Sequence, residues 1–249
     1  MSTVLESLRL AKSFGHVQAL YDTSFSLEAG EVVGLVGDNG AGKSTLIKVL
    51  SGVYARDSGS IIVEGHEQHF RRPADAVDAG ISTVYQDLAL VDTRDVAANL
   101  FLGREFRKGL FVDRKRLRDE ATRIIAGMAV KLPSVNVDVG MLSGGQRQAV
   151  AIARATLSHA KVIIMDEPTA ALGVTESAKV MELARRLADD GAAVLVISHN
   201  LREIWEIADR FLVMRLGTLA GTRRRDESSI DEIVKLIVYG EHPADPALG

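Results

Sequence analysis

A glycine-rich stretch with one lysine and two hydroxyl side chains follows a short apolar run near the start of the chain. Residues 37 to 45 read Gly-Asp-Asn-Gly-Ala-Gly-Lys-Ser-Thr, directly after the apolar segment Val32 to Val36. This is the pattern G-x-x-x-x-G-K-[ST], placed between an expected buried strand and an expected helix from Ser44 to Ser51. Glycines permit a tight turn whose N–H groups point inward, and the lysine can reach the β- and γ-phosphates of a nucleotide. We therefore predict that a nucleoside triphosphate binds Gly37, Asp38, Asn39, Gly40, Ala41, Gly42, Lys43, Ser44 and Thr45.

Two consecutive carboxylates end an apolar run in the second half of the chain. Asp166 and Glu167 directly follow the segment Val162 to Met165. In an open parallel sheet, ligands lie beyond the carboxyl ends of the strands, so Asp166 should point toward the glycine-rich loop. An aspartate there can orient Mg²⁺ through water, and Glu167 can polarise the water that attacks the terminal phosphate. Two acids after a strand also occur in turns and helix caps, but beside such a loop they indicate a hydrolytic site.

Two other polar residues follow expected strands. His199 lies just after the apolar run Ala193 to Ile197, and Gln86 follows the segment Ile81 to Tyr85. The histidine could contact the γ-phosphate or the attacking water, and the Gln86 amide could ligate Mg²⁺ and respond to the γ-phosphate. Each residue alone also fits an ordinary structural role. We predict a catalytic set of Lys43, Gln86, Glu167 and His199, and a set of Mg²⁺ ligands consisting of Ser44, Gln86 and Asp166.

A second glycine-rich segment lies in the middle of the chain. Leu142-Ser143-Gly144-Gly145-Gln146 precedes residues with helical spacing that continue to about Leu157. Ser143 is a favourable N-cap, and glycine amides at a helix N-terminus make an anion site. An ordinary capped helix does not need two consecutive glycines, because glycine at its start costs helix stability. The segment is therefore predicted to contact a nucleotide through Ser143, Gly144, Gly145 and Gln146, with a flexible capped turn as the competing interpretation.

Apolar runs that alternate with helical segments indicate an α/β fold with a mainly parallel sheet covered on both faces. Residues 60–65 and 81–85 suggest a short strand pair. The expected strands are residues 7–10, 20–27, 32–36, 60–65, 81–85, 162–165, 193–197, 211–214 and 218–221, and the helices after the first are 175–189 and 231–238. A frayed tail is expected at residues 241–249.

The segment from Asp87 to Lys161 differs from the rest of the chain in its pattern of apolar and charged residues. Helical periodicity dominates it and no strand is evident, so it looks like a helical subdomain inserted into the sheet. Cations are dense from Arg104 to Arg118, which invites a nucleic-acid or lipid-surface interpretation. Acidic residues interspersed among them favour a solvated helical face instead.

Composition excludes several classes of protein. The formal net charge is −3, so no overall field favours nucleic acid. The chain has no cysteine, which excludes disulfides, thiolate catalysis and cysteine-bound zinc. Charged residues interrupt the first ten positions, where a signal peptide needs an apolar stretch, and no apolar run approaches the roughly 20 residues that span a bilayer. A membrane process would therefore need another chain for the membrane part.

Taken together, the motifs resemble the nucleotide-binding subunit of an ATP-binding cassette (ABC) transporter, over essentially the whole chain. The most specific of them is the segment Leu142 to Gln146, in a chain that also has the glycine-rich phosphate loop at residues 37 to 45. The resemblance implies an ATP sandwich in which the phosphate loop, Gln86, Asp166, Glu167 and His199 of one copy close on nucleotide opposite Ser143 to Gln146 of another. It also places Phe14 as the aromatic that stacks on adenine, with Tyr21 as a weaker rival and a strand-end core residue as the alternative for Phe14.

The resemblance implies one cassette over residues 1–249. The nucleotide-binding α/β core would comprise residues 1–86 and 160–240, and the helical subdomain residues 87–159. The chain departs from the family pattern at one position. After Ala170-Ala171-Leu172 it has Gly173, whereas the family commonly has an aspartate there that helps couple the two sites of the dimer. The finer resemblance is to the ATPases of bacterial sugar importers. It rests on the segments Gly-Asp-Asn-Gly, Pro-Thr-Ala-Ala-Leu-Gly-Val-Thr-Glu-Ser and Ser-His-Asn-Leu.

These similarities imply an ATP- and Mg²⁺-dependent ATPase at the cytoplasmic face of a bacterial inner membrane. Its partners would be integral-membrane permease subunits, a second copy of the cassette and, indirectly, a solute-binding protein, with no nucleic acid. The helical insert and residues 87–100 would pass motion to the permease. Three alternatives stay open: a soluble cassette ATPase acting in translation or DNA repair, an exporter ATPase, and a module that uses ATP only to dimerise.

Overall fold

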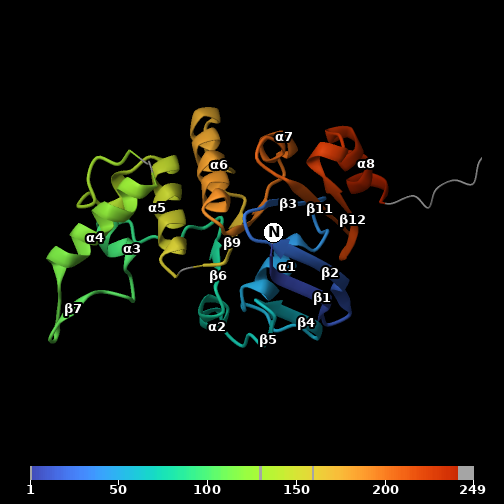
Figure 1. The fold of residues 1–249 in the computed structure, drawn as a ribbon, viewed down its shortest axis with the longest axis horizontal. Coiled ribbons are helices and arrows are strands. Elements are labelled where there is room, and N and C mark those ends of the chain that lie inside the picture. Colours follow the sequence, from blue (N-terminus) through green and yellow to red (C-terminus); the bar gives the residue numbers. More distant parts are fainter. Residues whose placement is uncertain (1, 129–130, 159, 241–249) are drawn as a thin grey trace, which may run out of the picture.

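A six-stranded sheet forms the centre of the molecule, with helices on both sides (Figure 1). The computed structural model describes residues 2–128, 131–158 and 160–240. The predicted tail 241–249 lies outside the described residues. The strands of this sheet, in spatial order, are β12 (Thr218–Arg224), β11 (Arg210–Arg215), β3 (Val32–Gly37), β10 (Ala193–Ile197), β9 (Val162–Asp166) and β6 (Ile81–Val84).

The sheet is parallel except for its terminal hairpin. Strands β11, β3, β10, β9 and β6 run in the same direction, and β12 pairs antiparallel with β11. The three central strands are almost wholly buried, as expected for apolar strands between two layers of helices. The α/β fold with a mainly parallel sheet is thus confirmed.

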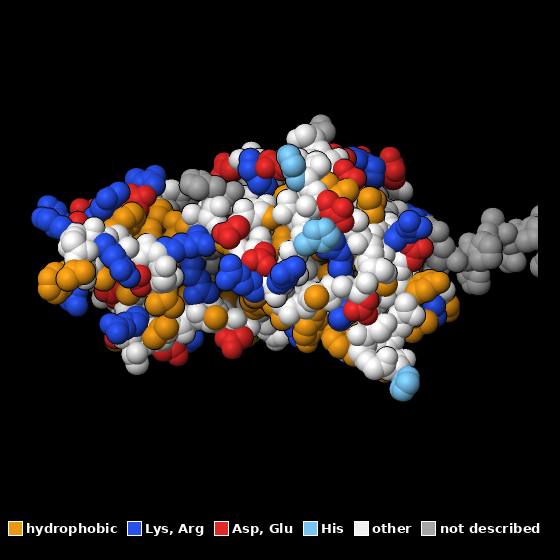
Figure 2. All heavy atoms as spheres, turned by 90° about the horizontal axis from the view of Figure 1, so that it is seen from below, with side chains coloured by type: hydrophobic (Ala, Val, Ile, Leu, Met, Phe, Trp, Pro, Cys, Tyr) orange, Lys and Arg blue, Asp and Glu red, His pale blue; other side chains and the backbone are white. Residues whose placement is uncertain are grey.

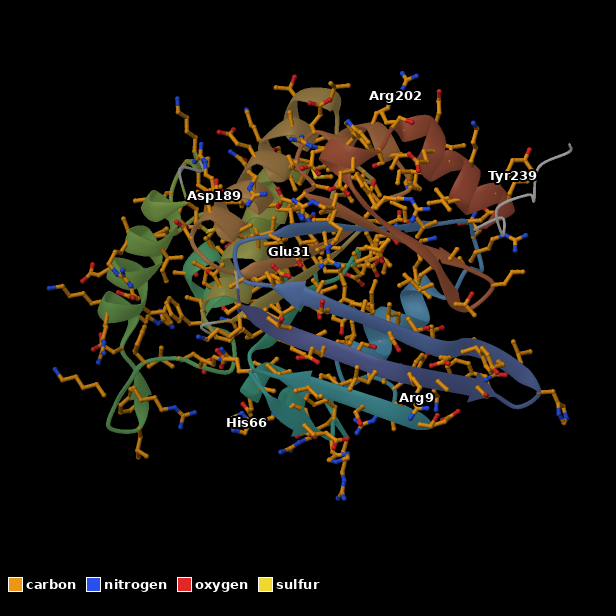
Figure 3. The ribbon with its side chains drawn as sticks, turned by 45° about the vertical axis from the view of Figure 1, so that its right-hand side comes forward. Arg9, Glu31, His66, Asp189, Arg202 and Tyr239 are labelled. Carbon is orange, nitrogen blue, oxygen red and sulfur yellow. The ribbon has the colours of Figure 1, made fainter. Side chains whose placement is uncertain are left out.

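A second, antiparallel sheet packs beside the first and contains most of the N-terminal residues. Its order is β2 (Val17–Glu28), β1 (Thr3–Phe14), β4 (Ser58–Val63) and β5 (His66–Gln68). Glu31 lies between the two sheets (Figure 3). The carboxylate of Glu31 accepts a 2.6 Å bond from the Arg210 guanidinium, which also donates to the Ser26 carbonyl at 2.8 Å. This buried pair ties β2 to β11.

The predicted pairing of residues 60–65 with 81–85 is wrong. Strand β4 pairs with β1 and β5 in the antiparallel sheet, whereas β6 joins the central sheet beside β9. Helix α2 (Pro73–Asp78) separates the two strands. Propensity marks each strand correctly, but the partner is chosen by long-range packing, which sequence spacing does not encode.

Helices cover the faces of the central sheet and form a separate cluster at one end of the molecule (Figure 1). The predicted helices near residues 44–51, 175–189 and 231–238 are confirmed, each within two residues of the observed ends. The helices are α1 (Lys43–Leu50), α2, α3 (Val96–Leu100), α4 (Arg114–Gly127), α5 (Gly144–Thr156), α6 (Val174–Asp189), α7 (Leu201–Trp205) and α8 (Ile230–Tyr239), with 3-10 turns at Val139–Met141 and Arg225–Glu227.

The segment between β6 and β9 has a hydrophobic core of its own. Helices α3, α4 and α5 bury it between them, with Val96, Leu117 and Val150 among its members. The expectation that this segment contains no strand is wrong. Arg107–Lys108 (β7) and Phe111–Val112 (β8) form a short antiparallel hairpin between α3 and α4. Strands of two residues are too short to produce a periodic signal, so the sequence pattern does not predict this hairpin. In the part of the chain that the structure describes, no helix is long and apolar enough to cross a membrane.

Candidate active site

The predicted catalytic residues follow neighbouring strands at one edge of the central sheet. In the register, Ile197 of β10 pairs with both Asp166 of β9 and Leu35 of β3. The carboxyl ends of β3, β9 and β10 therefore lie at the same level. Val84 of β6 pairs with Met165, so Gln86 emerges at the same edge. The fold thus gathers the phosphate loop, the two carboxylates, His199 and Gln86 where parallel sheets bind ligands.

Backbone crowding explains two of the glycines in the phosphate loop. Gly37 has φ +153° and a Cβ there would overlap the carbonyl oxygen of Met214 on β11. Gly42 has φ +100°, and a Cβ would lie 2.7 Å from the carbonyl oxygen of Ala19 on β2. Both positions combine a left-handed backbone with close contact to another strand, which only glycine tolerates. Helix α1 begins immediately after Gly42, so its N-terminal dipole faces the loop.

The Lys43 ammonium folds back over the loop. Its Nζ donates to the carbonyl of Gly37 at 2.7 Å and to that of Asp38 at 2.9 Å. Burial lowers the pKa of Lys43, and the nearby carboxylates of Glu167, Asp38 and Asp166 partly oppose this effect. The loop therefore holds a partly desolvated cation near three carboxylates, where it can bind phosphate oxygens.

Glu167 occupies a strained backbone position beside His199. Its φ is +47°, which is uncommon for a residue with a side chain, and its N–H donates to the Ile197 carbonyl at 3.0 Å. A carboxylate oxygen of Glu167 lies 3.2 Å from Nδ1 of His199. The Glu167 side chain keeps 28% of its surface exposed and can accept a proton from a water molecule held at this edge. Backbone strain of this kind often accompanies functional positions.

The residues at this edge fit a magnesium ion bound together with phosphate. Burial raises the pKa of Asp166, and the adjacent Glu167 adds to the shift, while Lys48 and Lys43 oppose it. A half-buried carboxylate of this kind gains from a cation. Among the described residues no group of three or more histidines, acids or cysteines could hold a metal by itself. Mg²⁺ commonly binds one or two protein oxygens together with substrate phosphates, and the exposed Ser44 hydroxyl and Asp166 supply such oxygens.

Replacing Asp166 with asparagine should stabilise the nucleotide-free protein at neutral pH. The folded-state pKa lies above the unfolded value, so ionised Asp166 opposes folding at pH 7, and this effect fades as the pH falls through the usual aspartate range. We expect the Tm of Asp166→Asn to exceed that of the wild type by roughly 1–4 °C at pH 7 in thermal scans, with a smaller difference near pH 4. Asp119→Asn, on the exposed face of α4, is the control. A lower Tm, or a gap that widens in acid, would contradict this explanation.

The two aromatic residues considered for stacking on the base both have exposed rings. Phe14, at the end of β1, is 43% exposed and packs edge-on against Tyr54, with ring centroids 5.1 Å apart. Tyr21 is 58% exposed, and its N–H donates to Gly217, whose own N–H donates to Ala41 of the loop. Phe14 is thus not a core residue, and its free surface is available for stacking on a base. Gln86 is exposed at the end of β6.

The segment Ser143 to Gln146 opens helix α5 but does not meet the phosphate loop within this chain (Figure 1). Ser143 and Gln146 form a reciprocal capping box, with bonds of 3.4 and 3.1 Å, and the Gln146 amide also donates to the Lys131 carbonyl. The Gln146 side chain is therefore engaged in holding the helix start.

Packing also contributes to the requirement for two glycines. A Cβ on Gly144 would lie 2.9 Å from the side chain of Leu172, and one on Gly145 would lie 3.1 Å from Glu176. Leu172 and Glu176 belong to the start of α6 and the turn before it. The sequence predicts an anion-binding role for both glycines, and close contact with α6 is a second reason for them.

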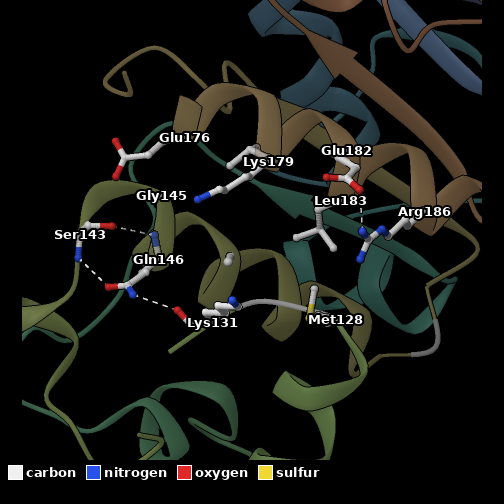
Figure 4. Close-up of a pocket in the computed structure, with 12 residues that line it drawn as sticks. Met128, Lys131, Ser143, Gly145, Gln146, Glu176, Lys179, Glu182, Leu183 and Arg186 are labelled. Atoms are coloured by element: carbon white, nitrogen blue, oxygen red, sulfur yellow. Dashed lines mark hydrogen bonds and ion pairs between the residues drawn. The ribbon is translucent and has the colours of Figure 1, made fainter. Parts of the chain in front are cut away.

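A cavity of about 380 Å³ lies between α5 and α6 behind this segment (Figure 4). Ser143, Gly145 and Gln146 line one side, and the other side bears a pair formed by Glu182 and Arg186 at 2.6 Å. No residue of the phosphate loop lines the cavity, so it is separate from the nucleotide edge.

Two contacts missed by sequence reasoning connect the site to its surroundings. Arg154 of α5 donates to the carbonyls of Leu88 and Ala89 at 2.6 and 2.8 Å, just after Gln86. Thr169, two residues after Glu167, donates to the Glu203 carboxylate of α7 at 2.8 Å. The first links the helix of the Ser143 segment to the strand end that bears Gln86, and the second links the acidic strand to the helix after His199. Neither pairing has a sequence signal, because the partners are 34 or more residues apart.

Arg154→Ala should destabilise the protein and loosen the segment after Gln86. It removes two charge-assisted bonds and leaves the part-buried Leu88 carbonyl without its partner, which costs about 2–4 kcal/mol in unfolding free energy. Arg118→Ala, an arginine on the exposed face of α4 that forms no salt bridge with the described residues, should change stability by less than about 0.5 kcal/mol. Urea titrations of both variants test this difference, and equal effects would contradict the assigned role of Arg154.

Comparison with known proteins places this architecture in a family. The family model described as ABC transporter matches residues 20–170. The chain is 45% identical over 237 residues to the xylose/arabinose import ATP-binding protein XylG of Sulfolobus acidocaldarius, covering 95% of this chain and 94% of the relative. It is 40% identical over 235 residues to the ribose import ATP-binding protein RbsA 2 of Escherichia coli O157:H7, but covers only 46% of that relative. The crystal structure of an ATP-binding cassette of an ABC transporter in its ADP conformation matches with a TM-score of 0.82 and 27% identity, over 96% of each chain.

The chain therefore belongs to the ABC transporter family, and it is one of the family's ATP-binding cassettes, which are ATPases. It spans nearly the full length of XylG but about half the length of RbsA 2.

Proposed function

We propose that this chain hydrolyses ATP to drive import of a sugar through a separate membrane permease. The observation that carries the proposal is the gathering of the phosphate loop, Asp166, Glu167 and His199 at one sheet edge, in a chain 45% identical to a protein named for xylose and arabinose import. The second relative is named for ribose import. We commit to the class of monosaccharides rather than to one sugar.

Within the proposed reaction, each residue at the edge has a distinct task. The loop amides and Lys43 would hold the β- and γ-phosphates, and Ser44, Asp166 and Gln86 would hold Mg²⁺, which would neutralise phosphate charge. Glu167 accepts a proton from the attacking water. His199, 3.2 Å from Glu167, orients that carboxylate and contacts the γ-phosphate. Phe14 stacks on the adenine ring, and Tyr21 is the alternative.

A second copy of the cassette completes the site in this proposal. Ser143, Gly144, Gly145 and Gln146 lie on a helix that does not reach the phosphate loop of the same chain. The Ser143 hydroxyl and the glycine amides of one copy would contact the nucleotide held by the other, and ATP would join the two. Closure then depends on the closed pair binding ATP better than ADP. The corresponding domain proposal is a single cassette, with its nucleotide-binding core at residues 1–86 and 160–240 and its helical subdomain at residues 87–159.

Gly173 departs from the family pattern without strain. Its φ of −72° is open to any residue, and a Cβ there would meet only a Glu176 oxygen at 3.8 Å. Position 173 can therefore accept aspartate sterically. We propose that the missing carboxylate changes communication between the two sites rather than abolishing hydrolysis, since Glu167 and His199 are in place.

The permease would contact the helical subdomain and residues 87–100 at the inner face of the membrane. Asn99 holds this stretch together: its buried side chain accepts from the Val91 N–H at 2.7 Å and donates to the carbonyls of Val91, Arg94 and Asp95. The stretch is thus a preformed turn, and Arg154 ties its start, at Leu88 and Ala89, to helix α5. Such a turn can transmit a change at the nucleotide to a bound partner.

Affinity capture tests the proposed partnership. Tagged Glu167→Gln, expected to hold ATP and remain closed, is purified with ATP from detergent-solubilised native membranes, and the co-purifying proteins are identified by mass spectrometry. Lys43→Ala serves as the control for nucleotide dependence. A multi-span permease whose operon or partner proteins handle sugars supports the proposal. Recovery with ribosomes or DNA, or only from the soluble fraction, would overturn the transport function and leave the ATPase chemistry intact.

A further inference from the structure

The hairpin between α3 and α4 carries the most exposed large apolar side chain among the described residues. Leu110 is 96% exposed and Phe111 80% exposed. They lie at and beside a two-residue turn, in which Gly109 has φ +64° and Lys108 pairs with Phe111. Two adjacent apolar side chains without packing partners cost solubility, so their exposure indicates a contact made in use.

Cations surround this tip. Figure 2 shows apolar side chains beside lysine and arginine at the corresponding end of the molecule. Within the described residues, the seven exposed cations nearest to the tip in sequence make no salt bridge; they are Arg104, Arg107, Lys108, Arg114, Lys115, Arg116 and Arg118. The neighbouring acids serve local structure, since Asp113 caps α4 and Glu105 accepts from the Gly103 N–H at 3.0 Å.

The tip of the hairpin is also separate from the edge of the central sheet where the nucleotide is expected to bind. Leu110 and Phe111 belong to none of the buried clusters, while the base of the hairpin is anchored by Phe106, which packs on Phe101 at 5.0 Å and under the Arg116 guanidinium. Asp113 donates its N–H to the Phe106 carbonyl at 2.8 Å and closes the hairpin. The hairpin is thus a firmly based projection whose tip alone is apolar.

We propose that this hairpin docks on the surface of an anionic lipid bilayer, with Leu110 and Phe111 in the interfacial region and the surrounding cations on lipid phosphates. An apolar tip within a basic ring matches the chemistry of such a surface, which attracts cations and accepts apolar side chains just below the headgroups. A soluble protein partner would not require so many unpaired cations around two apolar side chains. The contact goes beyond the proposed function, because it needs neither the permease nor nucleotide.

A single labelled cysteine tests the docking directly, because the chain has no cysteine of its own. The full chain with Leu110→Cys carries a polarity-sensitive nitrobenzoxadiazole label and is titrated with vesicles of equal parts phosphatidylcholine and phosphatidylglycerol. The same label at Tyr239→Cys, an exposed site on α8 at the other end of the molecule, is the control (Figures 1 and 3). We expect a blue-shifted, stronger emission for the Leu110 label only, lost in pure phosphatidylcholine and at about 0.5 M salt.

Two further variants separate the contributions of charge and apolar contact. Arg107→Gln with Lys108→Gln should weaken vesicle binding by about fivefold for each cation removed. Leu110→Ser with Phe111→Ser should weaken vesicle binding at low salt, because it removes the apolar contact and leaves all the cations in place. Both should keep the wild-type ATPase rate, since none of these residues belongs to the nucleotide site. Three outcomes would each overturn the proposal: identical emission changes at positions 110 and 239, no change at either position, or a change that appears only when permease is present.

Discussion

Glu167→Gln should bind ATP as the wild type does and lose nearly all hydrolysis. The glutamate is the carboxylate closest to His199, it keeps exposed surface, and its backbone is fixed at φ +47° by the bond from its N–H to Ile197. Glutamine preserves the shape and loses the proton acceptor. Removal of a general base lowers turnover by about 10²–10⁴-fold. Steady-state phosphate release gives the rate, and a titration with fluorescent ATP gives the affinity.

Glu206→Gln is the matched control for this substitution. Glu206 is exposed just after α7, and its side chain makes no hydrogen bond to the described residues. That variant should hydrolyse ATP at the wild-type rate. If Glu167→Gln turns over ATP at full rate, or if it fails to bind ATP, Glu167 is not the base.

Lys43→Ala should weaken the binding of ATP itself. The ammonium is half-buried in the loop and already bonds two carbonyls, so it is positioned for phosphate without a large rearrangement. A charge-assisted hydrogen bond contributes about 1.5–3 kcal/mol, which corresponds to a loss of roughly tenfold to a hundredfold in affinity. Isothermal titration with ATP and Mg²⁺ measures this loss.

Lys179→Ala removes a positive charge from an exposed position on α6 and serves as the control. Its ATP affinity should equal that of the wild type, and Lys43→Ala should remain folded, because the loop is held by backbone contacts as well. An unchanged affinity in Lys43→Ala would mean that residues 37 to 45 do not bind the triphosphate.

The local chemistry of the site is largely predictable from the sequence. The strand and helix around residues 37 to 45 lie where the motif requires them, and the two acids end β9 as expected from their place after an apolar run. Their convergence follows from a general property of parallel sheets, whose carboxyl ends share one edge. The roles assigned to these residues stay predictions, tested by the substitutions above.

The contacts between distant segments are not predictable in the same way. The bond from Arg154 to the carbonyls after Gln86, the pair Thr169 and Glu203, and the choice of β1 rather than β6 as partner of β4 all depend on how layers pack. The strain at Glu167 is likewise imposed by the surrounding backbone, since glutamate has no preference for φ +47°. Periodicity reports which face of an element is buried but not what buries it.

The most direct test of this account is the mass of Glu167→Gln in solution with and without ATP. The two halves of the site lie apart within one chain, so ATP must join two copies if both halves hold it. Light scattering should give one chain mass, 26.8 kDa, without nucleotide and twice that mass with saturating ATP and Mg²⁺. Ser143→Arg in the same background should stay at one chain mass with ATP bound. A Glu167→Gln protein that binds ATP fully and stays at the mass of a single chain would contradict the shared site.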